Sequence, residues 1–241
     1  LPRNPASNLK LLSTAFVISK YNYFNTLSTS LLRDNKNRYF LKGVGDPDLS
    51  LKDINTLIDK IIYSKFIDIT LIEVNKDLYW PDGWTSTDKL YKYGSPITQL
   101  AINSNSSSYM NIDFLKDYIY DYIFLKYPNS KINIYISNPN NFSQRKLTVI
   151  KELKSNNILS LITLANSESH NFTAEMLFKN LSNSWEENEY QKLFIWLKNK
   201  GLPMQNIFIS DASGLSRNNK LTTNLIASFL HKMRFNKNYD F

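Results

Sequence analysis

The sequence predicts a protein of mixed helices and strands, and two patterns carry this prediction. Near the start, Leu9, Leu12 and Phe16 recur at helical spacing. In residues 131–137 every second residue is isoleucine, which is typical of a half-buried strand. With 241 residues, of which 42% are hydrophobic and 14% aromatic, the chain can bury one large core or two small ones.

The first predicted helix covers about residues 5–20. Pro5 suits its first turn, where a missing N–H is not needed by the helix. Ser7 and Lys10 are three residues apart, so both side chains leave the same face. A serine hydroxyl becomes a good nucleophile when a base takes its proton, and a lysine with a lowered pKa can be that base. The positive end of the helix would stabilise an oxyanion there.

The Ser-x-x-Lys pattern by itself is more often a chance match than a catalytic site. It occurs three times, at residues 7–10, 86–89 and 143–146. The first differs from the others because the apolar run that follows it would hold the pair rigidly. The other two stand in polar, loop-like surroundings.

The next segments continue the mixed pattern. Residues 25–37 are polar and predict a short helix and a turn, and strands are predicted at 39–41 and 66–74. Ser50 and Asp53 resemble a capping box, which marks a helix start. Further helices are predicted at 112–126, from 138 to about 156, and at 171–181, 189–198 and 222–233; an extended piece is predicted at 94–102, strands at 131–137 and 207–209, and a turn-rich loop at 211–217.

The composition excludes several kinds of chemistry. The chain has no Cys and two His, which excludes disulfides and thiolate catalysis and argues against zinc; a site made of carboxylates alone stays open. We predict no cofactor and no metal. There is no apolar run near 18 residues, so no transmembrane segment is expected. The chain begins at Leu1, without Met or a visible signal peptide, so we expect that an upstream piece was removed or not included.

The net charge of +8 is compatible with an anionic partner such as nucleic acid, anionic lipid or an acidic cell-wall polymer. The basic residues are dispersed, however, with no block of five or six. The chain is also rich in Lys, Asn, Ile and Tyr throughout, and this general composition is the favoured explanation of the charge.

A second candidate motif is Ser169-His170-Asn171, just before a predicted helix. Ser169 could relay a proton and Asn171 could bind a carbonyl group; alternatively, Ser169 caps the helix. Ser-x-Asn also occurs at 155–157 and 216–218, so the tripeptide alone would favour capping.

Three motifs, taken together in the order in which they occur, favour the catalytic interpretation of Ser169 over the capping one. Asn-Pro-Ala-Ser-Asn-Leu-Lys at 4–10, Ser-His-Asn-Phe-Thr-Ala-Glu at 169–175 and Asp-Ala-Ser-Gly-Leu-Ser-Arg at 211–217 resemble those of the D-alanyl-D-alanine carboxypeptidase/endopeptidase family of low-molecular-mass, class C penicillin-binding proteins. Residues 45–47, 81–84 and 94–96 also look like pieces of the domain that this family inserts between its first two motifs.

The sequence departs from the family pattern at four points. His170 replaces the commoner Asp, Ala212 stands where Gly is usual, and Asn103 falls where some relatives carry an acid. There is no Lys-Thr-Gly, the motif on the downstream strand that supplies one oxyanion-hole N–H in the family. The sequence therefore looks like an internal fragment, which we expect to be inactive alone.

The resemblance implies an α+β fold. Residues 1–38 and 159–241 would form the helical part of a β-lactamase/transpeptidase-like domain, with most of the parent five-stranded sheet missing. Residues 39–158 would form an inserted α+β domain.

The resemblance also implies a serine D-Ala-D-Ala carboxypeptidase or endopeptidase that acts on peptidoglycan stem peptides and is penicillin-sensitive. Ser7 would form the acyl-enzyme, Lys10 would be its base, and Ser169 would carry the proton to the leaving amine. Asn171 would hold the substrate amide and orient Lys10.

Arg217, Ser213 and Gly214 are predicted to bind substrate, with Arg217 taking a carboxylate; pairing with a nearby surface acid is the alternative for Arg217. Peptidoglycan peptides and β-lactams would be the partners, without nucleic acid, and the compartment would be the periplasm. The alternative function is a non-catalytic glycan- or nucleic-acid-binding module. In a degenerate glycan binder Ser7 and Lys10 would be blocked or separated.

Overall fold

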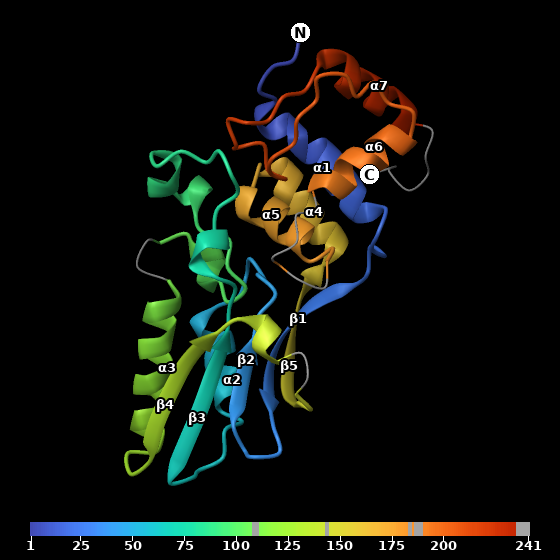
Figure 1. The fold of residues 1–241 in the computed structure, drawn as a ribbon. Helices are drawn as coiled ribbons and strands as arrows, with labels where there is room; N and C mark the ends of the chain where they lie inside the picture. The colour runs from blue at the N-terminus through green and yellow to red at the C-terminus, as the bar shows by residue number, and fades with distance from the viewer. Residues whose placement is uncertain (108–110, 143–144, 183–184, 186–189, 235–241) are drawn as a thin grey trace. The chain divides into compact units, whose positions relative to one another are not determined.

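The computed structural model describes residues 1–107, 111–142, 145–182, 185 and 190–234. The chain packs as two compact units: the first comprises Leu1–Asn25, Trp80–Gly94 and Asn157–Phe241, and the second Thr26–Tyr79 and Ser95–Asn156 (Figure 1). The predicted division into 1–38 with 159–241 and 39–158 stays a prediction. In terms of packing, residues 26–38 belong with the second unit and residues 80–94 with the first.

The second unit is built on a five-stranded sheet in the order β4-β3-β2-β1-β5. The strands are β1 (Thr26–Arg33), β2 (Tyr39–Lys42), β3 (Phe66–Ile72), β4 (Lys131–Ser137) and β5 (Thr148–Asn157). β1 and β2 are antiparallel, whereas β2, β3 and β4 are parallel. Parallel neighbours need crossover connections, which α2 (Leu51–Ile58) and α3 (Ile112–Lys126) supply.

The alternation of side chains divides the core of this unit between the two faces of the sheet. α2, α3 and one face share a cluster that includes Leu31, Leu41, Ile54, Leu57, Ile69, Leu71, Leu115, Ile119 and Ile123. On the other face, Leu32, Phe40 and Ile72 pack with Phe142 and Leu147.

Several predicted elements of this unit are confirmed and others are wrong. α3 and β4 have the predicted bounds, β2 and β3 begin where predicted, and the Ser50/Asp53 capping box is present. The helix predicted within 25–37 is strand β1, and the one predicted up to about 156 contains strand β5. No strand forms in the predicted extended piece at 94–102. Both wrong helices are strands that pair within the sheet, so tertiary pairing overrides their mixed local pattern.

The first unit is a helical assembly around α1. Its helices are α1 (Leu9–Ile18), α4 (Ile158–Ser167), α5 (Asn171–Lys179), α6 (Tyr190–Asn199) and α7 (Thr223–Met233). Nine of the ten residues of α1 are buried, and the ring of Phe16 contacts those of Phe178 and Trp196. A 3-10 turn, η1 (Ala6–Asn8), leads into α1, which gives the predicted first helix its start.

The later predictions for this unit are largely confirmed. α5, α6 and α7 correspond to the predicted helices, although Glu189, the predicted start of one of them, lies outside the described residues. In the predicted strand at 207–209, Phe208 makes an isolated bridge with Lys220.

Residues 80–94 are anchored in the first unit by the loop at 210–217. Trp84 Nε1 donates to Asp211 Oδ2 at 3.0 Å, Ser216 Oγ donates to the Asp82 carbonyl at 2.5 Å, and Arg217 N donates to the Gly83 carbonyl at 3.0 Å. This segment carries two 3-10 turns, η3 (Asp88–Leu90) and η4 (Lys92–Gly94).

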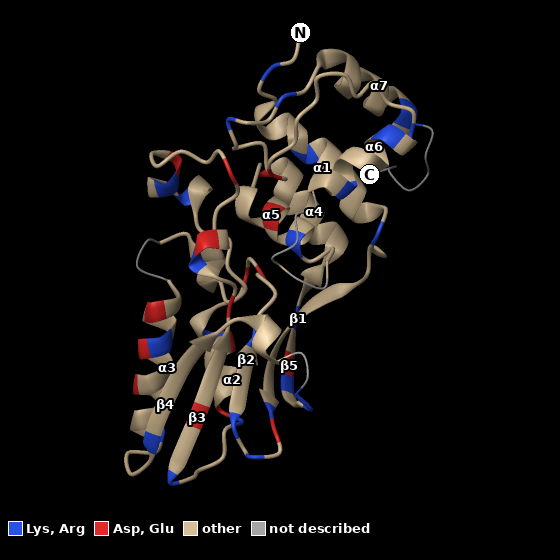
Figure 2. Ribbon diagram, viewed as in Figure 1, with Lys and Arg blue, Asp and Glu red and all other residues tan. Residues whose placement is uncertain are grey.

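Charged residues are spread over many elements of each unit, and on α3 basic and acidic residues follow one another (Figure 2). Among the described helices, none has both the length and the apolar character needed to cross a membrane.

Candidate active site

Ser7 lies in η1 and is exposed. Lys10 lies three residues later, in the first turn of α1, and is buried, with only 2% exposed. The backbone before Ser7 is held in an unusual conformation, since Ala6 has φ 47° and its N–H donates to Asn4 Oδ1 at 3.0 Å. The predicted pair is present: Lys10 Nζ is 3.1 Å from Ser7 Oγ.

Oxygen atoms from four residues surround Lys10 Nζ. Asn171 Oδ1 lies at 2.6 Å, the Ser213 carbonyl oxygen at 2.9 Å, Ser7 Oγ at 3.1 Å and Ser169 Oγ at 3.4 Å. Ser7 and Ser169 are 162 positions apart in the sequence, yet their Oγ atoms are 2.6 Å apart. The fold of the first unit therefore brings the predicted Ser7, Lys10, Ser169 and Asn171 together.

The types of these oxygens favour a particular arrangement of protons. The Ser213 carbonyl and Asn171 Oδ1 can only accept, and the orientation of the Asn171 amide is fixed because its Nδ2 donates to the Tyr93 carbonyl at 2.9 Å. A neutral Lys10 amine can satisfy both acceptors with its two N–H groups. Its lone pair then faces the two hydroxyl groups, which is the arrangement that a base for Ser7 requires.

Ser169 does not act as the helix cap that the alternative prediction proposed. It has φ 54°, and the N-cap of α5 is His170, which makes no side-chain capping bond. The Ser169 hydroxyl instead faces Ser7 and Lys10.

Burial lowers the pKa of Lys10 from 10.5 to about 8, and the negative charges of Glu175 and Asp211 oppose this shift. A lysine with a pKa near 8 has a substantial neutral fraction at mildly alkaline pH. The environment of Lys10 therefore favours the base form far more than an exposed lysine would.

The loop at 211–214 packs against α1 and the backbone before Ser7. Ser13 Oγ donates to the Ala212 carbonyl at 2.6 Å, and the next carbonyl, that of Ser213, faces Lys10. Gly214 has φ 87°, and a Cβ atom there would lie 1.9 Å from the Ala6 carbonyl oxygen. The close approach of these two backbones requires glycine at this position.

Asp211 organises this loop. It is fully buried and accepts from Gly214 N at 2.8 Å and from Ser216 N at 2.6 Å. Ser213 Oγ lies 3.3 Å from Asp211 Oδ2. The burial of Ser213 and Gly214 favours a supporting place behind Ser7 and Lys10, and direct substrate contact by these two residues stays a prediction.

Arg217 pairs with Asp88 at 3.4 Å, as the alternative prediction proposed, although Asp88 is a buried acid and not the surface acid that was expected. The Arg217 side chain is still 61% exposed, whereas that of Asp88 is 5% exposed. Tyr93 OH lies 3.4 Å from Asp88, and the Tyr93 carbonyl accepts from Asn171. Thus Arg217 is linked to the site through Asp88 and Tyr93, and most of its side chain is open to solvent.

Sequence reasoning missed Glu175, Asp211 and Tyr93. Glu175 could have been found, because it stands four residues after Asn171 and so shares its helix face. Of the other two Ser-x-x-Lys matches, Ser86 and Lys89 are both exposed and Lys89 lies over the Trp80 ring, and Ser143 lies outside the described residues.

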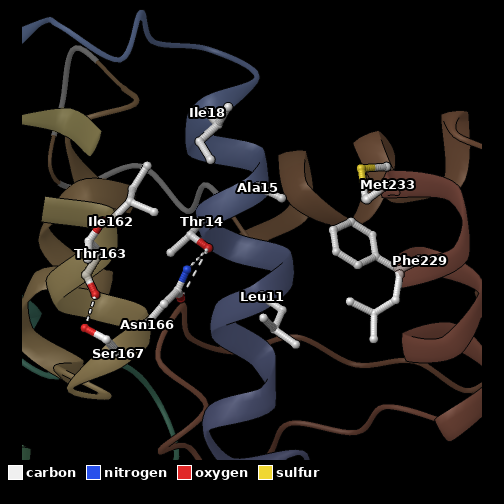
Figure 3. A pocket seen from close by; sticks show the side chains of 11 residues that line it. Leu11, Thr14, Ala15, Ile18, Ile162, Thr163, Asn166, Ser167, Phe229 and Met233 are labelled. Carbon is white, nitrogen blue, oxygen red and sulfur yellow. Dashed lines mark hydrogen bonds between the residues drawn. The ribbon is translucent and has the colours of Figure 1, made fainter. Parts of the chain in front are cut away.

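A separate apolar pocket of about 400 Å³ lies along α1, α4 and α7 (Figure 3). Its lining includes Leu11, Ala15, Ile162 and Phe229, and Ser7 and Lys10 are not part of it. Within the described part of the chain, no group of three or more His, Asp or Glu residues could hold a metal ion.

Comparison with known proteins gives a partial match to a family model and a shared fold. The model of the D-Ala-D-Ala carboxypeptidase 3 (S13) family matches residues 132–240. No curated protein matches the sequence. Penicillin binding protein 4 from Haemophilus influenzae shares the fold with a TM-score of 0.73 at 15% identity, over 97% of this chain and 70% of that one.

Two further structures resemble the chain. The same Haemophilus protein in complex with a novel β-lactam has a TM-score of 0.70 at 16% identity, over 99% of this chain and 70% of that one. Bd3459, a predatory peptidoglycan endopeptidase from Bdellovibrio bacteriovorus, has a TM-score of 0.55 at 14% identity, over 96% of this chain and 63% of that one. The family match and the shared fold confirm the predicted resemblance to the D-alanyl-D-alanine carboxypeptidase/endopeptidase family of class C penicillin-binding proteins.

Proposed function

We propose that the chain belongs to a penicillin-sensitive serine D-Ala-D-Ala carboxypeptidase or endopeptidase that acts on peptidoglycan stem peptides. The observation that carries the proposal is the meeting of Ser7 Oγ, Ser169 Oγ and Asn171 Oδ1 around Lys10 Nζ, all within 3.4 Å. The S13 family match and the β-lactam complex of a structural relative support it.

In the proposed acylation step, neutral Lys10 takes the proton of Ser7 as Oγ attacks the carbonyl carbon of the scissile amide. The Ser7 N–H stabilises the oxyanion. Ser169 then donates its proton to the leaving amine and recovers one from Lys10. Its Oγ lies 2.6 Å from Ser7 Oγ, where the amine leaves, and 3.4 Å from Lys10 Nζ. The C–N bond breaks and an ester of Ser7 remains.

In the proposed deacylation step, Lys10 takes a proton from water, which attacks the ester carbonyl. The ester bond breaks, Ser7 Oγ regains its proton, and the carboxylic acid product leaves. Asn171 keeps Lys10 oriented in both steps through its 2.6 Å contact. Because peptidoglycan lies outside the inner membrane, we propose a periplasmic location.

The alternative of a non-catalytic glycan-binding module predicts that Ser7 and Lys10 are blocked or separated. Ser7 is exposed and bonded to Lys10, which favours the enzyme. The scattered basic residues do not favour a nucleic-acid partner.

The test is covalent labelling of the complete protein by a fluorescent penicillin. We expect Ser7→Ala to abolish labelling, since the nucleophile is gone, while Ser86→Ala, in the exposed Ser-x-x-Lys match, is labelled like the wild type. Labelling that persists in Ser7→Ala would refute the mechanism.

A further inference from the structure

Glu175 is a buried carboxyl group behind Lys10 that the proposed mechanism does not use. It stands on α5 one turn after Asn171 and is fully buried. Residues four apart on a helix share a face, so α5 directs both side chains toward the same region. Asn171 contacts Lys10 directly, whereas Glu175 contacts the loop that lies against Lys10.

The contacts of Glu175 fix the backbone of this loop. Glu175 Oε1 accepts from Ala212 N at 2.9 Å and from Ser213 N at 2.7 Å. The peptide unit between Ala212 and Ser213 is therefore held at both ends, since Ser13 Oγ donates to its carbonyl at 2.6 Å. The following peptide unit presents the Ser213 carbonyl to Lys10 Nζ at 2.9 Å.

Charged and titratable groups from several of the described elements face Glu175 or the tyrosine bonded to it. Lys10 comes from α1 and Asp211 from the loop, and Tyr190 OH on α6 donates to Glu175 Oε2 at 3.1 Å. Asp82, in the segment at 80–94, acts on Tyr190. This arrangement places two buried carboxyl groups in the field of one buried lysine.

Burial and the charge of Asp211 raise the pKa of Glu175 to about 7, against the bonds from the loop N–H groups, which lower it. Once charged, Glu175 raises the pKa of Lys10 and so opposes the effect of burial. The protonation of Glu175 and that of Lys10 are thus linked.

We propose that Glu175 is a positioning residue for Lys10. Glu175 orients the Ser213 carbonyl toward Lys10 Nζ and supplies negative charge that acts on the ammonium group. The inference rests on the proposed function, in which Lys10 is the base for Ser7. It adds that Glu175 acts both on the backbone of the loop and, together with Asp211, on the protonation of Lys10.

The test is Glu175→Gln in the complete protein. Glutamine keeps an oxygen that can accept from both loop N–H groups but removes the charge. We expect the pKa of Lys10 to fall by roughly 0.5–1 unit. The pKa is followed by NMR of protein labelled with 13C-lysine, and the Lys10→Arg variant assigns the signal. The midpoint of the rate of penicillin acylation against pH moves down by the same amount, and its plateau falls because a weaker base remains.

Glu73→Gln is the matched control. Glu73 is also a buried glutamate that accepts from backbone N–H groups, those of Val74, Gln99 and Leu100, but it belongs to the second unit. Its replacement should leave the pKa of Lys10 and the midpoint of acylation at the wild-type values.

The outcomes separate the inference from the proposed function. If Glu175→Gln lowers the plateau but leaves the pKa of Lys10 unchanged, Glu175 is merely structural and the inference is overturned. If the pKa moves but the wild type is never labelled, the inference stands and the proposed function fails. If Glu175→Gln does not fold, the Tyr190→Phe variant decides. It removes the hydroxyl that stabilises charged Glu175, so the pKa of Lys10 should fall by a smaller amount than in Glu175→Gln. An unchanged pKa of Lys10 in Tyr190→Phe overturns the inference.

Discussion

The contact between Gly214 and the backbone before Ser7 gives a sharp test of how the site is built. In Gly214→Ala the new Cβ atom would lie 1.9 Å from the Ala6 carbonyl oxygen, 2.5 Å from its carbon and 3.2 Å from Ser7 N. These are backbone atoms, so no side-chain rotation relieves the overlap. The Ala6–Ser7 peptide unit must move, and with it the N–H proposed to stabilise the oxyanion.

The magnitude follows from two separable effects. Gly214 has φ 87°, a left-handed conformation that costs a residue with a Cβ atom roughly 1–2 kcal/mol. The overlap adds about 1–3 kcal/mol, as for other overpacked sites. Displacing one oxyanion donor lowers the rate by on the order of 100-fold.

Gly201→Ala separates these effects. Gly201 also has a positive φ, 69°, but the nearest atom to its Cβ would be Lys232 Nζ at 3.8 Å, so this variant carries the conformational cost without the overlap. We expect both variants to unfold more easily than the wild type in urea, with Gly214→Ala about 1–3 kcal/mol less stable than Gly201→Ala. Acylation by a fluorescent penicillin should fall only in Gly214→Ala. A Gly214→Ala protein that is folded and acylated at the wild-type rate would refute the reasoning.

Two further predictions concern charges. Burial raises the pKa of Glu73 to about 7, so between pH 4.5 and 7 the folded state binds more protons than the unfolded state, and the free energy of unfolding falls as pH rises through this window. Urea unfolding at pH 5 and pH 8 should show a change that is smaller in Glu73→Gln than in the wild type, by on the order of 3 kcal/mol at most, and an equal change in both proteins would contradict the prediction. Arg217→Ala should change the free energy of unfolding by less than about 1 kcal/mol, because the ion pair with Asp88 is largely exposed on the arginine side. It should raise KM for peptides with a free carboxylate by roughly 10- to 100-fold, and an unchanged KM would remove Arg217 from the substrate site.

How far the sequence predicts the fold depends on whether a pattern is local. The Ser50/Asp53 capping box and the α3 and β4 elements are set by neighbouring residues, and all are present as predicted. The sequence predicts helices where the structure has the strands β1 and β5. Thr26–Arg33 and Thr148–Asn157 lack a clean alternation, and their conformation depends on pairing with distant strands. Local pattern therefore fails where the partner is remote in sequence.

The same limit applies to the site. The sequence motifs named Ser7, Lys10, Ser169 and Asn171, because these residues occur at spacings that a known family shares. Glu175 is different: its spacing places it on the same helix face as Asn171, but a charged residue on a helix is normally expected at the solvent surface, so the spacing alone does not indicate burial. Its buried carboxyl group is stabilised by hydrogen bonds from the backbone N–H groups of Ala212 and Ser213, which are 37 and 38 positions away in the sequence.

The surroundings of Lys10 reconcile two requirements that oppose each other. A base for Ser7 must be neutral, which burial favours, but a lysine whose pKa fell too far would be a poor proton acceptor. Glu175 and Asp211 raise the pKa that burial lowers, and the balance stands at about 8. The acceptor-only oxygens of Asn171 and Ser213 then hold the two N–H groups of the neutral amine and leave its lone pair toward Ser7. On this reasoning, the buried acids adjust the strength of the base and the two acceptors adjust its direction, so variants of the acids should move the pH profile while variants of Asn171 should lower the rate without moving it as far.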